Sequence, residues 1–126
     1  MPNLLLVMAG GAIGAGFRYH VGRVALQNVG PGFPWGTLIV NLVGGLLMGV
    51  LAAVIVQDGP ADRDLFLFLG TGVLGGFTTF SAFSLDMFAM LQRGDHALAL
   101  GYAGASVAGS LLLLILGYSG MKAVMA

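Results

Sequence analysis

Neutral hydrogen-bond donors recur inside stretches of this sequence that are otherwise apolar. Asn41 stands among Leu, Val and Ile residues, with Thr37 one helical turn before it and Gly45 one turn after it. An amide surrounded by hydrocarbon must form hydrogen bonds, and its NH₂ group can offer two protons to an anion. The alternative is a hydrogen bond between two helices, which is common in membrane bundles. The pattern leaves both roles open for Asn41, and Thr37 shares its helix face.

A second set of donors lies near the C-terminal end of the chain. Tyr102, Ser106 and Ser110 are spaced four residues apart, so a helix would align their hydroxyl groups in one stripe. A hydroxyl can donate to an anion without the full positive charge that would trap the anion. The same stripe could instead bond to its own helix backbone and support close packing. A polar track for an anion and a packing stripe are both compatible with this spacing.

The segment 70–84 combines glycines, threonines and phenylalanines. Paired glycines followed by the β-branched Thr78 and Thr79 weaken a helix, and an irregular backbone within a membrane must be buried in protein or line a cavity. We therefore predict a broken helix here, with a glycine-rich packing kink as the alternative. Phe80 and Phe83 follow, three residues apart. Phenylalanine in a membrane usually faces lipid or the core, but an aromatic ring can also present its positive edge to a small anion.

Arg18 is the cation placed deepest in an apolar stretch. At the centre of a membrane helix, Arg adds roughly 2.5 to 3.5 kcal/mol to the insertion free energy unless it reaches the interface or finds a partner. Gly10, Gly14 and Gly22 recur around it at four-residue spacing and leave one helix face almost bare. The pattern favours a packing seam over direct contact with an ion. Arg18 is therefore predicted to have a structural role.

The elements that must carry these residues are membrane spans. The chain has 126 residues, of which 58% are hydrophobic and 8% are charged, whereas soluble proteins carry about 25% charged residues. A formal net charge of +0 and the lack of a basic stripe argue against a nucleic-acid partner. The sequence contains no cysteine, which excludes disulfides and thiolate metal sites.

Four apolar stretches are long enough to cross a bilayer, which takes about 20 residues each. We predict one all-α transmembrane domain over residues 1–126, with spans at about 3–27, 35–57, 65–91 and 97–121. An acidic loop at 58–64 is expected to separate the second span from the third. The third span is the one predicted to be broken at mid-membrane.

The basic residues do not fix one orientation of these spans. Arg63 and Lys122 belong to one side, and Arg18, Arg23 and Arg93 belong to the other. Because Lys and Arg near the span ends bias those ends toward the cytoplasm, a count of two against three decides little. The chain is predicted to insert in both orientations and to form an antiparallel homodimer, although few charges alone would also give this balance.

Three segments in order resemble the Fluc/CrcB fluoride channel family, and the resemblance extends over all four spans. They are GGAIGA at 10–15 with Arg18 and Tyr19, GTLIVN at 36–41 with Gly44, and GGFTTFSAF at 75–83. The family usually has Thr where this chain has Ala82, which puts in doubt any hydroxyl role at that position.

The resemblance implies a dual-topology homodimer in the cytoplasmic membrane, with two antiparallel pores that passively export fluoride. It implies that Asn41 and the ring edges of Phe80 and Phe83 contact fluoride, with Thr37 nearby. The polar track would be formed by Tyr102, Ser106 and Ser110. It also implies a structural Na⁺ that is not transported, held by the backbone carbonyls of Gly75 and Thr78 from both subunits.

Other functions fit the residues less well. A small proton-coupled multidrug exporter is the alternative, but it needs a titratable carboxylate within the membrane. Asp86 is the only acidic residue inside a span, and it is expected to be solvated or paired with Arg near the span's end. An enzyme is not expected, because His20 and His96 have neither a nearby Ser and acid nor a metal-ligand pattern.

Overall fold

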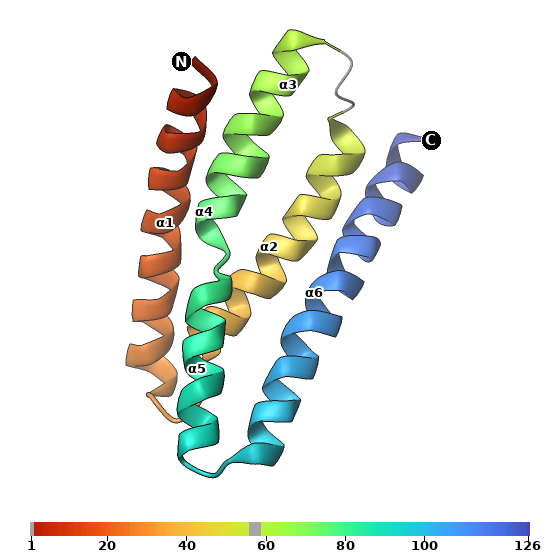
Figure 1. Ribbon diagram of the computed structural model, residues 1–126. Coiled ribbons are helices and arrows are strands. Elements are labelled where there is room, and N and C mark those ends of the chain that lie inside the picture. Colours follow the sequence, from red (N-terminus) through yellow and green to blue (C-terminus); the bar gives the residue numbers. More distant parts are fainter. Residues whose placement is uncertain (1, 56–58) are drawn as a thin grey trace.

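The computed structural model describes residues 2–55 and 59–126, and these form a bundle of helices (Figure 1). The described part contains no strand, as the all-α prediction requires. The elements in chain order are α1 (Pro2–Val29), α2 (Trp35–Val54), α3 (Pro60–Phe66), the π-helix η1 (Leu67–Leu74), α4 (Gly75–Phe77), α5 (Phe80–Gln92) and α6 (His96–Met125).

Four helical stretches are long and apolar enough to cross a membrane, which confirms the four-span fold class. They cover Asn3–Val29, Trp35–Val54, Pro60–Gln92 and His96–Met125. Only 11% to 28% of the residues in the apolar stretch of each span are buried within the single chain. Since most of the apolar surface faces outward, its surroundings must be lipid or another protein chain.

The third span begins earlier than the sequence indicated. Pro60 to Asp64 were expected in an acidic loop, but they form the start of α3, with Pro60 in its first turn and Gly59 as N-cap. Pro suits this position because its missing N–H would have no helical partner there. The predicted end of the second span at Gln57 lies outside the described residues, and α2 ends at Val54.

The third span is broken, and the threonines rather than the glycines carry the break. Gly70, Gly72, Gly75 and Gly76 all lie in helical backbone, of which Leu67–Leu74 has the wider π-helical winding. The backbone is extended at Thr78 and Thr79, before α5 resumes at Phe80. In Figure 1 the chain runs as a thin connection between α4 and α5, about halfway along the bundle.

The glycines instead allow close contacts between α1 and its neighbours. A Cβ atom on Gly10 would lie 2.9 Å from the backbone nitrogen of Val73, and one on Gly14 would lie 2.8 Å from that of Phe77. One on Gly36 would lie 2.7 Å from the Cα atom of Gly22. The bare face predicted for the first span is therefore a seam against η1, α4 and α2.

A second seam joins α2 to α6, and these two helices make the most extensive contact in the bundle. A Cβ atom on Gly49 would overlap the carbonyl group of Leu114, and one on Gly117 would overlap that of Leu46. Because small residues allow membrane helices to approach closely, this seam fixes α6 against α2. α6 in turn presents Ser106 and Ser110 beside the break.

Candidate functional site

Asn41 binds the backbone at the break through both ends of its amide. Its Oδ1 accepts a hydrogen bond from the Thr79 N–H at 2.8 Å, and its Nδ2 donates to the Thr79 carbonyl at 3.1 Å. α2 thus supplies hydrogen bonds that a continuous helix would have made within itself. The Nδ2 atom of Asn41 carries two protons, so one of its N–H groups remains beyond the bond to Thr79.

Arg18 holds the other side of the break. Its Nε donates to the Gly76 carbonyl at 3.0 Å, across from α1 to α4. The carbonyl groups at the C-terminal end of a helix carry partial negative charge, which favours a cation there. The half-buried Arg18 guanidinium therefore has a partner of matching charge within the protein.

Thr79 also acts as the N-cap of α5. Its Oγ1 accepts a hydrogen bond from the Ala82 N–H at 3.2 Å and lies 3.3 Å from the Ser81 hydroxyl. A threonine before a resuming apolar helix is a recognisable cap in sequence. The sequence interpretation placed the break here but assigned Thr79 no role, although its position before Phe80 carried that signal.

Two backbone carbonyls at the break lose their usual helical partners. In a continuous helix the Gly75 carbonyl would accept from the Thr79 N–H, but that N–H donates to Asn41. The Thr78 carbonyl would accept from the Ala82 N–H, which donates to the Thr79 hydroxyl instead. Hard cations bind oxygen ligands, so the carbonyl oxygens of Gly75 and Thr78 are suitable ligands for Na⁺.

An open groove of about 360 Å³ lies on the side of the break that faces α6. Its lining residues come from α2, the break, α5 and α6: Asn41, Gly44, Gly45, Met48, Thr78, Thr79, Phe80, Phe83, Ser106, Val107, Ser110 and Leu114. The groove therefore brings together five of the residues predicted to contact fluoride or form its track.

The two serines of the predicted track differ in what they bond to. The Ser110 hydroxyl donates to the backbone carbonyl of Asn41 at 3.2 Å, so it joins α6 to α2. Ser106 is 6% exposed, and its Oγ is buried without a hydrogen-bond partner among the described residues. A buried hydroxyl normally has a partner, so Ser106 retains a donor for an occupant of the groove.

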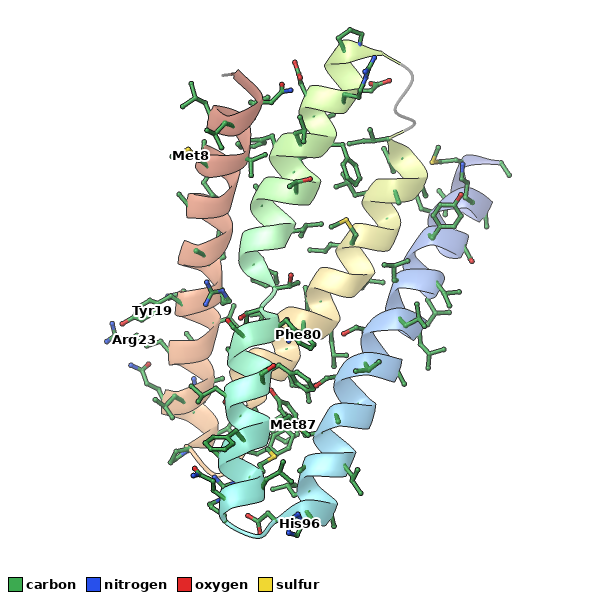
Figure 2. The ribbon with its side chains drawn as sticks, in the orientation of Figure 1. Met8, Tyr19, Arg23, Phe80, Met87 and His96 are labelled. Atoms are coloured by element: carbon green, nitrogen blue, oxygen red, sulfur yellow. The ribbon has the colours of Figure 1, made fainter. Side chains whose placement is uncertain are left out.

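The two phenylalanines lie at the mouth and the base of this groove. Phe80 is 76% exposed and Phe83 is 9% exposed, with their ring centroids 5.6 Å apart. Phe83 also packs against Tyr102 at 5.1 Å between ring centroids. Figure 2 shows Phe80 at the start of α5, whereas Met8 lies on the outer side of α1.

Tyr102 does not continue the stripe into the groove. Its side chain is 1% exposed, and its hydroxyl donates to Oδ2 of Asp86 at 2.8 Å. Asp86 was expected to be solvated or paired with Arg. It is half-exposed and accepts the phenol of α6, and no Arg forms an ion pair with it among the described residues. No sequence pattern indicates this pair, since the two residues lie on different helices.

Thr37 does not line this groove. It lines a second groove of about 390 Å³ between α1, α2 and α5, together with Arg18 and Arg23. Thr79 and Ala82 complete that groove where it meets the broken backbone. Thr79 is shared by both grooves, so the break lies between two open spaces.

The sequence is also similar to known proteins. The family described as "CrcB-like protein, Camphor Resistance (CrcB)" matches residues 5–118. The chain belongs to the CrcB family. This match extends into all four membrane helices of the chain and includes the break, both grooves and the Arg18 seam.

CrcB proteins that resemble this chain carry one shared name. A protein of Mesorhizobium japonicum is 50% identical over 117 residues, which cover 93% of this chain and 94% of the relative. A protein of Rhizobium meliloti is 50% identical over 124 residues, covering 98% of this chain and 99% of the relative. Both are named "Fluoride-specific ion channel FluC". These CrcB relatives are thus ion channels by name, not enzymes.

Proposed function

We propose that this protein is a fluoride-selective channel that passively exports fluoride and so lowers its cytoplasmic concentration. The observation that carries the proposal is the broken third span, which places neutral donors and aromatic rings in one groove. The full-length similarity to proteins named as fluoride-specific channels supports the same ion. Passive flow needs no titratable carboxylate, and none lines that groove.

Fluoride is proposed to pass along the groove between α5 and α6. The Ser106 hydroxyl and the second N–H of Asn41 replace part of its water shell. The rings of Phe80 and Phe83 offer their positive edges, and the N-terminal end of α5 adds partial positive charge. All these groups are neutral, so they stabilise the ion without trapping it.

The remaining predicted residues border this path. Ser110 holds α6 against α2 through the Asn41 carbonyl, and the Tyr102 ring packs against Phe83. Thr37 lies in the second groove. We propose that these three residues line the approach to the path rather than its narrowest part.

The functional unit is proposed to be a homodimer of two inverted copies in the cytoplasmic membrane. Both termini and α3 lie at one end of the bundle, and the α5–α6 connection lies at the other (Figure 1). Arg63 and Lys122 belong to the first end, and Arg93 belongs to the second, so neither end is strongly basic. The open grooves and the exposed Phe80 give a second copy a surface to complete.

A structural Na⁺ is proposed at the centre of this dimer, where it would supply a fixed positive charge that is not transported. The carbonyls of Gly75 and Thr78 would hold it, because their helical amide partners bond elsewhere. Backbone oxygens suffice for a hard cation, and no cluster of three His, Asp or Glu residues occurs in the described ranges.

Ion efflux from liposomes tests the proposed activity directly. Vesicles containing the purified protein are loaded with fluoride or chloride, and the release of each ion is followed with a selective electrode. We expect rapid fluoride release, negligible chloride release, and no requirement for a proton gradient. Fluoride release that depends on an imposed proton gradient would contradict the channel and favour a coupled exporter.

A further inference from the structure

We propose that Asn41 and Thr79 are positioning residues of the cation site, because their side chains divert the two amides that would otherwise bond its carbonyl ligands. This inference rests on the Na⁺ site in the proposed function. It assigns to two side chains the task of keeping the Gly75 and Thr78 carbonyls available.

The first diversion is made by α2. In a continuous helix the Thr79 N–H would bond to the Gly75 carbonyl, four residues earlier. Instead, Oδ1 of Asn41 accepts a hydrogen bond from this N–H at 2.8 Å, and Nδ2 of Asn41 donates to the Thr79 carbonyl at 3.1 Å. With both backbone groups of Thr79 bonded to one amide, the residue is held in its extended conformation.

The second diversion is made by Thr79 itself. The Ala82 N–H would bond to the Thr78 carbonyl in a continuous helix, but Oγ1 of Thr79 accepts it at 3.2 Å. Asn41 and Thr79 therefore act in sequence: the amide fixes the backbone of Thr79, and the fixed Thr79 places its hydroxyl over the first turn of α5.

Arg18 leaves the two ligand carbonyls untouched. Its Nε donates to the Gly76 carbonyl, which lies between them in sequence. The hydrogen-bond donors at the break thus bond to the Gly76 carbonyl and not to the carbonyls of Gly75 and Thr78. This selectivity is what a site built from two specific carbonyls requires, since a cation needs oxygens that are not already bonded to N–H groups.

The test measures Na⁺ binding through stability, because a ligand that binds only the folded state raises the melting temperature. The single tryptophan, Trp35, reports thermal unfolding of the purified protein in detergent. Na⁺ replaces N-methyl-D-glucamine at constant ionic strength, and the Na⁺ concentration at half-maximal stabilisation is recorded for each variant.

Thr79→Val preserves side-chain shape and removes the hydroxyl. We expect the Na⁺ midpoint to rise by about tenfold, because the Ala82 N–H can then bond to the Thr78 carbonyl and compete with Na⁺ for it. Asn41→Ala is expected to raise the midpoint by at least as much. Thr79→Ser retains the hydroxyl and should keep the wild-type midpoint, which separates the diversion from a general loss of packing.

Thr71→Val is the matched control, with the same substitution in the same span. Thr71 lies on the exposed side of η1, away from the break, and its variant should keep the wild-type midpoint. A wild-type midpoint in Thr79→Val, or an equal shift in Thr79→Ser, would overturn the inference while leaving the cation site intact. A wild-type protein that does not respond to Na⁺ would overturn the cation site as well.

Discussion

The seam between α2 and α6 and the break between α4 and α5 are held together by opposite kinds of contact. The seam is apolar and depends on missing side chains, since Gly49 and Gly117 let backbone touch backbone. The break is polar and depends on side chains that are present, because Asn41, Thr79 and Arg18 replace backbone hydrogen bonds. We therefore expect changes in the seam to affect whether the protein folds, and changes at the break to affect what the folded protein binds.

A bulky residue in the seam should have the largest effect of all. Gly49→Val would drive a side chain into the Leu114 carbonyl, and overpacking of this kind destabilises by about 1 to 3 kcal/mol or more. We expect little monodisperse protein by size-exclusion chromatography. Gly120→Val is the control, because a Cβ atom there meets nothing within 4 Å. Normal folding of Gly49→Val would contradict the proposed role of the seam.

Removing the hydroxyl of Ser106 should change transport more than stability. Its Oγ has no partner in the part of the chain that the structure describes, so Ser106→Ala gives up no protein hydrogen bond. One hydrogen bond to a charged group contributes about 1.5 kcal/mol, so we expect about tenfold slower fluoride efflux from liposomes. Ser110→Ala should slow efflux less and lower the melting temperature more, because Ser110 bonds to α2. The reverse order would show that Ser110 is the residue that contacts the ion.

Replacing Arg18 should affect the fold moderately and the ion path little. Arg18→Gln keeps a donor within reach of the Gly76 carbonyl but loses the charge, which should lower the free energy of unfolding by about 1 kcal/mol. Thermal unfolding measures this loss, and fluoride efflux is then compared at equal amounts of folded protein. Selective loss of efflux at unchanged stability would place Arg18 in the ion path.

The smallest effect is expected at Asp86. Asp86→Asn keeps an oxygen that can accept the Tyr102 hydroxyl, so the pair between α5 and α6 survives without its charge. Fluoride efflux should stay close to that of the wild type. Complete loss of transport in this variant would instead favour a carrier that needs this carboxylate.

The fold could be predicted largely from the sequence because the dominant physical term is simple. Apolar stretches of sufficient length must form helices in a bilayer, and their number follows from the punctuation between them. The start of α3 at Pro60 was missed because polar residues beyond a span can still continue its helix. Hydropathy marks what enters lipid, whereas helix ends depend on local caps.

The site could be predicted in part, and the contacts that were not predicted share one cause. The spacing of Asn41, Ser106 and Ser110 indicated donors on particular helix faces, but not which atoms each donor meets. The break was expected where the paired glycines are followed by Thr78 and Thr79; the glycines remain helical, and the break lies at the two threonines, where Asn41 can replace the lost bonds. Partners on other helices, such as Tyr102 for Asp86, depend on packing that no local pattern encodes.

The most direct test of the central claim is fluoride efflux from liposomes containing the Asn41→Asp variant, with size-exclusion chromatography and thermal unfolding of the same sample. An ionised Asp can still accept the Thr79 N–H, but it has no proton for the Thr79 carbonyl and repels an anion. We predict a protein that elutes like the wild type and releases no fluoride. Fluoride efflux at the wild-type rate from a folded Asn41→Asp protein would contradict the assignment of the ion path to the break.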